Sequence, residues 1–156
     1  MNFGLLLSET VSINYMNTQE MWQETRTVYS YVRDLHGLLS LQAVGNYFQD
    51  AAGSDANNRG FGMEDLMKQN AIWVLARMKI KMGSYANWGD KLTVQTWVEN
   101  IEHYYAERHF LLTRGKQVIA RGMSNWAVID TERRRPKRVD NYKHNMPVHP
   151  GKRALE

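Results

Sequence analysis

The sequence has 156 residues and a formal net charge of +4, with 43% apolar and 23% charged residues. This length and balance are typical of one globular domain that buries a core of its own. No cysteine is present, which excludes a disulfide framework, a cysteine nucleophile within these residues and a zinc site built from thiolates. A chain without cysteines suits a reducing compartment. We therefore expect a cytoplasmic protein. We also expect that it uses no metal and no cofactor.

The patterning divides the chain into three parts. Residues 1–20 are a weakly patterned lead-in, whose short apolar patch lacks the basic start of a signal peptide and ends at Ser8 and Glu9. Residues 21–138 are expected to form one domain, and residues 139–156 are a basic, polar tail expected to trail over the surface. No apolar run approaches the ~18–20 residues that cross a bilayer, so we expect no membrane contact.

The first half of the chain predicts a strand, a turn and one long helix. Residues 24–33 are rich in β-branched and aromatic side chains, which favours a strand. The segment from Asp34 to Gly37 is typical of a turn. From residue 38 to residue 52 apolar side chains recur at helical spacing, and Gly53 is a suitable C-terminal stop.

After residue 70 the pattern changes to the alternation of strands. In residues 73–82 the even-numbered side chains from Val74 to Met82 are apolar, and most odd-numbered ones are basic. Further strands are expected within 91–101, 104–114 and 117–130, and the short loops between them favour antiparallel pairing. The prediction is an α+β domain in which one long helix packs on an antiparallel sheet of about five strands.

Six short segments carry a resemblance to a known family. They are Asn70–Arg77, Trp88–Leu92, Val94–Trp97, Arg108–Phe110, Ala120–Asp130 and Thr131–Pro136. In their order and spacing, between about Glu24 and about Arg138, they resemble the acyl-acyl-carrier-protein (acyl-ACP) thioesterases. The resemblance implies a hotdog fold, in which the sheet wraps around the central helix. It also implies hydrolysis of fatty acyl thioesters, with release of the free fatty acid in fatty acid biosynthesis.

The resemblance covers only the first of the two hotdog repeats that such thioesterases usually carry. The family's catalytic Asp, Asn and His, with a further Cys or Glu, lie in the second repeat and have no counterpart here. The family pattern also expects His where Asp55 stands and Asp where His109 stands. The alternative to an active thioesterase is therefore an acyl-binding or structural half that requires a second repeat.

Two carboxylates and one histidine are candidate catalytic groups, because thioester hydrolysis needs a base for water and donors for the carbonyl oxygen. Asp34 lies where single-repeat hotdog thioesterases that resemble this turn place their catalytic Asp, beside an expected helix N-terminus; it would equally serve to shape the turn. His36 could act as a general base near neutral pH or be a surface residue. Asp50, on the polar side of the helix, is either a second carboxylate of the site or a solvated group.

Four large side chains are candidates for an acyl pocket, since aromatic rings and methionine suit an irregular apolar ligand. They are Trp73, Met78, Trp97 and Trp126. The same residues would serve as ordinary core.

A basic run is the candidate surface for an acidic ACP. It consists of Arg133, Arg134, Arg135, Lys137 and Arg138. No base-reading module or stacking-aromatic motif accompanies it, so we expect no binding of nucleic acid. The alternative is a solvated strand end. A lone hotdog repeat also leaves a sheet edge open, which favours a homodimer.

Overall fold

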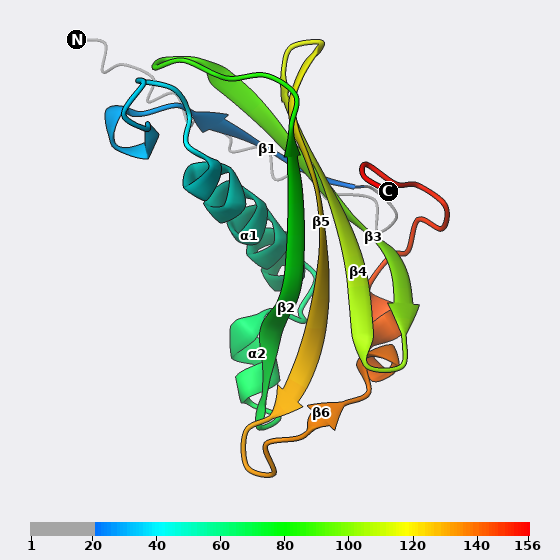
Figure 1. Ribbon diagram of the computed structural model, residues 1–156. Coiled ribbons are helices and arrows are strands. Elements are labelled where there is room, and N and C mark those ends of the chain that lie inside the picture. The colour runs from blue at the N-terminus through cyan, green and yellow to red at the C-terminus, as the bar shows by residue number, and fades with distance from the viewer. Residues whose placement is uncertain (1–20) are drawn as a thin grey trace, which may run out of the picture.

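The computed structural model describes residues 21–156 (Figure 1), so the expected lead-in lies outside the described residues. The strands are β1 (Trp22–Thr27), β2 (Ala71–Met82), β3 (Lys91–Glu102), β4 (Tyr105–Arg114), β5 (Gln117–Asp130) and β6 (Pro136–Lys137). The helices are α1 (Leu41–Asn58), α2 (Met63–Met67) and two 3₁₀ helices, η1 (Ser30–Val32) and η2 (Val139–Asn145).

One antiparallel sheet and one long helix form the domain. The strand order is β1-β3-β4-β5-β2, with the short β6 paired to β5. Helix α1 lies on one face of the curved sheet (Figure 1). The chain after β6 first packs on that same face, where the Tyr142 ring lies 6.5 Å from the Trp73 ring and Met146 joins the apolar cluster around Phe61. Its last residues then cross the other face, where Ala154 contacts His109. We call the face that carries α1 the inner face and the opposite one the outer face. The expectation of a long helix on an antiparallel sheet of about five strands is confirmed.

Helix α1 begins and ends later than its pattern predicts. It starts at Leu41 because the Ser40 hydroxyl accepts a hydrogen bond from the Ala43 N–H at 3.1 Å, which is a typical N-cap. It continues through Gly53 to Asn58, because a single glycine weakens a helix without ending it. The additional turn places Asp55 and Ala56 against the sheet, where both are buried.

The core between α1 and the sheet depends on one close approach of backbone and ring. The Phe48 and Phe110 rings stack with their centroids 4.7 Å apart, and both side chains are fully buried. Gly122 in β5 lies directly under Phe48: a Cβ added there would be 2.6 Å from Cε2 of that ring. Only a residue without a side chain fits at this position.

A β-bulge corrects part of the predicted strand facing. The pairing of β2 with β5 shifts between Leu75 and Arg77, so the period of two is interrupted there. Met78 packs against the core as predicted. Before the bulge, Trp73 and Leu75 face inward, whereas Val74 is exposed. The sequence pattern had grouped Val74 with the other even-numbered apolar residues, which would place it on the inner face.

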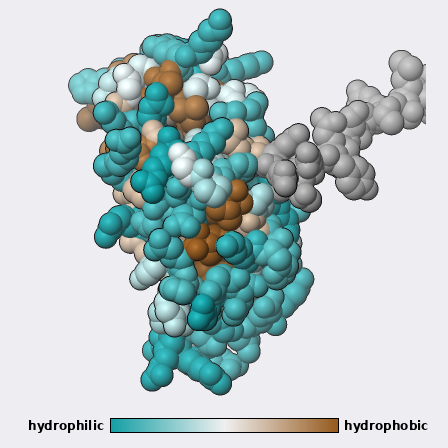
Figure 2. Space-filling model, turned by 90° about the vertical axis from the view of Figure 1, so that its right-hand side faces the viewer, coloured by the Kyte–Doolittle hydropathy of each residue, from teal (hydrophilic) through white to brown (hydrophobic). Residues whose placement is uncertain are grey.

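The tail after residue 138 is part of the fold instead of trailing over the surface. Val139 and Met146 are buried, and Val148 forms a parallel bridge to Val98 beyond the end of β1. The view turned toward this side shows a mostly hydrophilic surface with apolar areas near its centre and at its upper left (Figure 2). The basic and polar composition of residues 139–156 led to the wrong expectation, because the few apolar residues that anchor this segment are isolated in the sequence.

The glycine beneath Phe48 gives a test of the packing. Gly122→Ala should lower the free energy of unfolding by about 1–3 kcal/mol, because the buried ring cannot move away from the new methyl group. Gly53→Ala is the matched control, since a Cβ there meets nothing within 4 Å; it should raise stability by about 0.5–1 kcal/mol. Urea denaturation measures both, and equal midpoints for the two variants would contradict the described packing.

Candidate functional site

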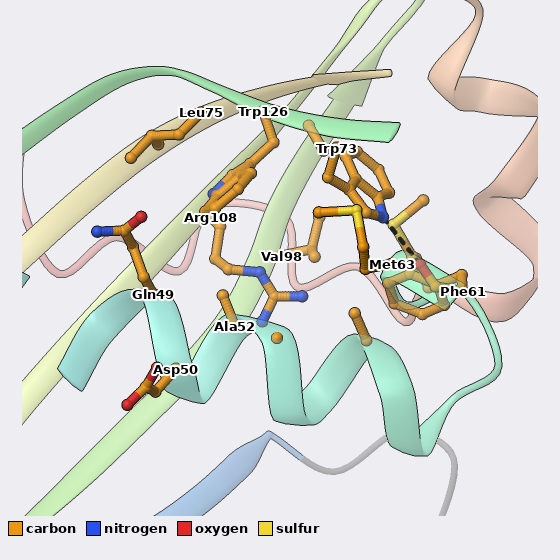
Figure 3. A pocket seen from close by; sticks show the side chains of 14 residues that line it. Gln49, Asp50, Ala52, Phe61, Met63, Trp73, Leu75, Val98, Arg108 and Trp126 are labelled. Carbon is orange, nitrogen blue, oxygen red and sulfur yellow. Dashed lines mark hydrogen bonds between the residues drawn. The ribbon is translucent and has the colours of Figure 1, made fainter. Parts of the chain in front are cut away.

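A cavity of about 360 Å³ opens between the second half of α1, α2 and the inner face of the sheet (Figure 3). It exists because the buried face of α1 changes in size along its length. Phe48 fills the space under the first half, whereas Ala52, Gly53 and Ala56 leave the space under the second half open. Ala106 on β4 adds to the hollow. The cavity is therefore encoded by small residues on both sides.

Aromatic and aliphatic side chains form most of the cavity wall. These are Phe61, Met63, Trp73, Leu75, Val98, Trp126 and Met146. Trp73 is fixed by a 2.8 Å hydrogen bond from its indole nitrogen to the Phe61 carbonyl oxygen (Figure 3). The Trp126 indole donates to the Ser124 hydroxyl at 2.7 Å. Because both indole N–H groups already have hydrogen-bond partners within the protein, their rings can present apolar surface to a ligand.

A buried ion pair joins α1 to the sheet beside the cavity. Nη1 of Arg108 donates to Oδ2 of Asp55 at 2.9 Å and to the Thr96 hydroxyl at 3.2 Å. Asp55 also accepts from Nε of Arg59 at 2.5 Å. Burial lowers the pKa of Arg108, and the neighbouring Asp55 carboxylate opposes that shift. Removing Asp55 would leave the buried charge of Arg108 uncompensated, so this contact holds the helix against the sheet.

Sequence reasoning missed this pair as a site. Asp55 attracted notice only as a departure from the family pattern, and Arg108 only as part of a matching segment. The signal was nevertheless present in the periodicity. Arg108 lies on the same strand face as Phe110 and Leu112, so the alternation of β4 was enough to indicate that a charge enters the core there.

The three catalytic candidates are not brought together. The Asp34 carboxylate accepts the backbone N–H groups of His36 and Leu38 at 2.8 and 3.1 Å, so it shapes its own turn. The expected helix N-terminus is not beside it, because Ser40 caps α1. Asp34 and His36 are exposed and do not line the cavity. Asp50 does line it, is exposed to solvent, and lies 3.7 Å from Nη2 of Arg26.

Two of the four acyl-pocket candidates line the cavity. Trp73 and Trp126 do so, whereas Met78 packs against the main core and is not part of the lining. Trp97 corrects the prediction, because its position in the alternation of β3 turns it to the outer face. There its indole donates to the Lys152 carbonyl oxygen at 2.7 Å, beneath the C-terminal segment.

The basic run separates into paired and unpaired cations. Lys137 lies 3.4 Å from an Asp130 carboxylate oxygen, and Arg138 contacts Asp140 at 2.5 Å. The other three arginines, at positions 133–135, are exposed, and their side chains form no ion pair with a described residue. Within this run, only those three arginines can bind an acidic partner without first breaking an ion pair inside the protein.

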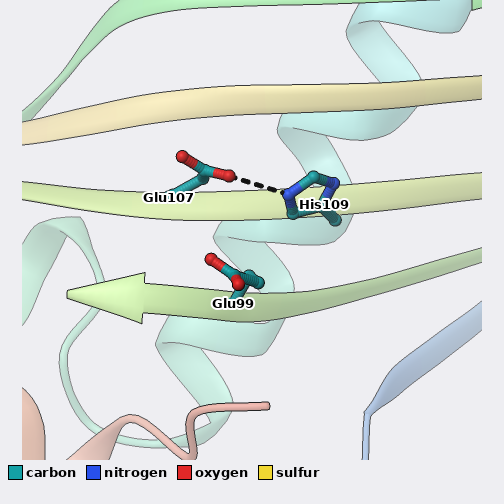
Figure 4. Close-up of side chains that lie close together, drawn as sticks. All are labelled: Glu99, Glu107 and His109. Atoms are coloured by element: carbon teal, nitrogen blue, oxygen red, sulfur yellow. Dashed lines mark hydrogen bonds and ion pairs between the residues drawn. The ribbon is translucent and has the colours of Figure 1, made fainter. Parts of the chain in front are cut away.

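A second polar cluster, on the outer face, consists of Glu99, Glu107 and His109, with ligand-type atoms within 4.8 Å of one another (Figure 4). Nδ1 of His109 accepts a hydrogen bond from the Ala154 N–H at 3.2 Å. The proton of the neutral ring is then on Nε2, which donates to Glu107 at 3.0 Å. A metal needs that nitrogen unprotonated, so the contacts are those of an anchor for the C-terminal segment. Glu99 completes the anchor by accepting the Gly151 N–H at 3.0 Å.

Comparison with known proteins identifies the family. The pattern of the acyl-ACP thioesterase N-terminal domain matches residues 19–144. The chain belongs to this family. It is 26% identical over 147 residues to the oleoyl-acyl carrier protein thioesterase 2, chloroplastic, of Arabidopsis thaliana, a match that covers 89% of the chain and 38% of that protein. An acyl-ACP thioesterase from Bacteroides thetaiotaomicron superposes with a TM-score of 0.79 at 27% identity, over 87% of the chain and 56% of that structure.

The hotdog fold is confirmed by these structures. The chain spans about a third of the length of the curated relatives and just over half of the structure from Bacteroides thetaiotaomicron. A probable thioesterase from Bartonella henselae shares the fold with a TM-score of 0.71 at 17% identity, and there the match covers 99% of the other chain. The described residues thus form one hotdog unit.

Proposed function

We propose that this acyl-ACP thioesterase chain binds the acyl group of a fatty acyl thioester in its cavity and takes part in its hydrolysis to the free fatty acid. The observation that carries the proposal is the apolar cavity of about 360 Å³ in a member of this family. Its size and walls are typical of sites for small apolar ligands. A carrier protein would present the acyl chain at the mouth, where Gln49 and Asp50 are exposed.

Asp50 is the one lining residue that could act as a general base, among the described residues around the cavity. Its carboxylate would take a proton from a water molecule as the water oxygen attacks the thioester carbonyl carbon. The carbon–sulfur bond then breaks, and the departing thiolate receives a proton. The products are the fatty acid and the carrier thiol.

A non-catalytic acyl-binding half is the second candidate function. The observation in its favour is that the described lining contains one carboxylate and no histidine, while Asp34 is occupied by its own turn. A general acid and further oxyanion donors would then have to come from another repeat. The two candidates differ in turnover and agree in acyl binding.

A thiol-release assay with a decanoyl thioester of pantetheine separates the two functions. If the chain is active alone, Asp50→Asn should lower kcat about 100-fold or more, because the base is lost. Asp34→Asn is the matched control and should leave kcat within about twofold, since Asp34 is outside the cavity. Binding of the acyl group without turnover in the unmodified chain would instead establish the acyl-binding half.

The exposed arginines predict a salt-sensitive encounter with the acidic carrier. Arg133→Glu with Arg134→Glu should slow association with acyl-ACP roughly tenfold at low ionic strength, and the difference should shrink as salt is added. Stopped-flow fluorescence measures the rate. The matched reversal Lys91→Glu with Lys116→Glu makes the same charge change elsewhere on the exposed surface. Equal slowing by both pairs would show an effect of net charge alone.

The two edge strands of the sheet favour a homodimer. β1 and β2 are the terminal strands, and each pairs on one side only among the described residues. β2, with 12 residues, is the longer of the two, and Val74 on it is 38% exposed. Open edges of that length are usually covered in native proteins. We propose that two copies pair through β2 about a two-fold axis.

Light scattering tests the dimer. The unmodified chain should give twice its monomer mass of 18.2 kDa at micromolar concentration. Val74→Glu should yield monomers, because two copies of the charge would meet near the axis, whereas Lys81→Glu near the strand end should remain dimeric. A monomer in the unmodified protein would contradict the proposal.

The cellular location remains a prediction from composition. The described residues include no helix that is long and apolar enough to span a membrane. Fractionation of the producing cells would test the cytoplasmic location, and recovery in another compartment would contradict it.

A further inference from the structure

Arg108 has hydrogen-bonding capacity that the described part of the protein does not use. Its side chain is only 6% exposed. A guanidinium carries five N–H groups, and the two on Nη1 are directed to Asp55 and Thr96. The Nε–H and the two Nη2 N–H groups form no hydrogen bond with a described residue. Leaving such donors buried and unpaired costs about 1–3 kcal/mol.

The unused nitrogens face the cavity. Among described residues, the one fully enclosed side-chain nitrogen or oxygen without a partner is Oε2 of Glu99, on the outer face. Nε and Nη2 of Arg108 are therefore in contact with open space, and Arg108 is itself a cavity-lining residue. Figure 3 shows its guanidinium reaching from the sheet toward Ala52 on α1. A nearly buried cation thus points three donors into a space with otherwise apolar walls.

The geometry of the free edge indicates which ligand atoms fit. Nε and Nη2 lie side by side on one edge of the guanidinium plane, where they can donate two parallel hydrogen bonds to a carboxylate or converge on one oxygen. A plain hydrocarbon offers no acceptor and would leave all three donors unpaired. Gln49 and Asp50 mark the exposed mouth, whereas Thr96 and Asp55 behind Arg108 are buried. The acceptor belongs to the inner part of the ligand.

We propose that the cavity selects acyl chains that carry an oxygen acceptor away from the thioester, as a hydroxyl, keto or carboxylate group, and that Arg108 recognises this oxygen. The inference rests on the proposed acyl binding in the cavity and narrows its substrate class. Sites built to hydrogen-bond a ligand oxygen discriminate strongly against the analogue that lacks it, because the buried polar group is then left unpaired. Asp55 and Thr96 orient the guanidinium so that its free edge stays toward the ligand.

Isothermal titration calorimetry with the full chain tests the selection. The ligands are non-hydrolysable amide analogues of acyl-pantetheine: decanoyl, decanoyl with a hydroxyl or keto group at successive inner carbons, and decanoyl ending in a carboxylate. In these analogues the amide joins the acyl chain to pantetheine, so no free carboxylate is present at that end. A carboxylate that binds Arg108 must therefore come from the far end of the acyl chain. At least one oxygenated chain should bind about tenfold or more tightly than plain decanoyl. A plain chain that binds as tightly as every oxygenated one would overturn the proposal.

The assignment to Arg108 is tested with a charge-balanced variant. Arg108→Met with Asp55→Asn removes both members of the ion pair, and the preference for the oxygenated chain should fall to within about twofold while plain decanoyl still binds. Should that variant fail to fold by circular dichroism, Arg108→Lys keeps the charge, loses the two-donor edge and should lose most of the preference. A preference that persists in a folded variant would overturn the role of Arg108. Absence of binding by every chain would instead contradict the acyl cavity itself, and with it the proposed function.

Discussion

The change of side-chain size along the buried face of α1 is the constraint on which the rest of the structure depends. In the first half of the helix, Phe48 stacks on Phe110 over a glycine and closes the space to the sheet. In the second half, small residues cannot reach the sheet, so the gap has to be spanned in another way. Arg108 spans it by reaching Asp55. One helix face therefore provides both a closed core and an open cavity.

This arrangement explains why a buried ion pair is present where apolar packing would be the simpler solution. Filling the gap with larger apolar side chains is often as stable as a buried pair or more stable. Such a replacement would also eliminate the cavity. The Asp55–Arg108 pair holds helix and sheet at a fixed separation while the space beside it stays empty. We interpret the pair as a support whose free edge also serves the ligand.

The sequence was sufficient for the architecture because helix and strand periodicities differ clearly in this chain. It predicted the long helix, the antiparallel sheet and two of the cavity tryptophans, Trp73 and Trp126. It failed where one residue changes the register or the face. The bulge after Leu75 reversed the facing of Val74. Trp97 was chosen for its residue type, although the alternation of β3 places it with Thr93 and Gln95 on the face opposite Leu92 and Val94. The error at Val74 arises because pairing and curvature depend on neighbouring strands that no local pattern specifies.

The candidate site was less predictable than the fold because its members are far apart in the sequence. Asp34 and His36 looked catalytic from their turn, yet the turn uses the Asp34 carboxylate for its own backbone. The Asp55–Arg108 contact joins residues 53 positions apart, and only the packing of α1 on β4 brings them together. A charge at an inward position of a strand was the available signal. Such a charge indicates a buried partner or a ligand, and here the structure supports both.

The most direct test of the central claim is a crystal structure of the protein with a non-hydrolysable decanoyl-pantetheine analogue. The account predicts electron density for the acyl chain between the second half of α1 and the sheet, in contact with Trp73 and Trp126, and the amide that replaces the thioester near Asp50. Acyl density on the outer face of the sheet, or beside the turn at Asp34, would contradict it.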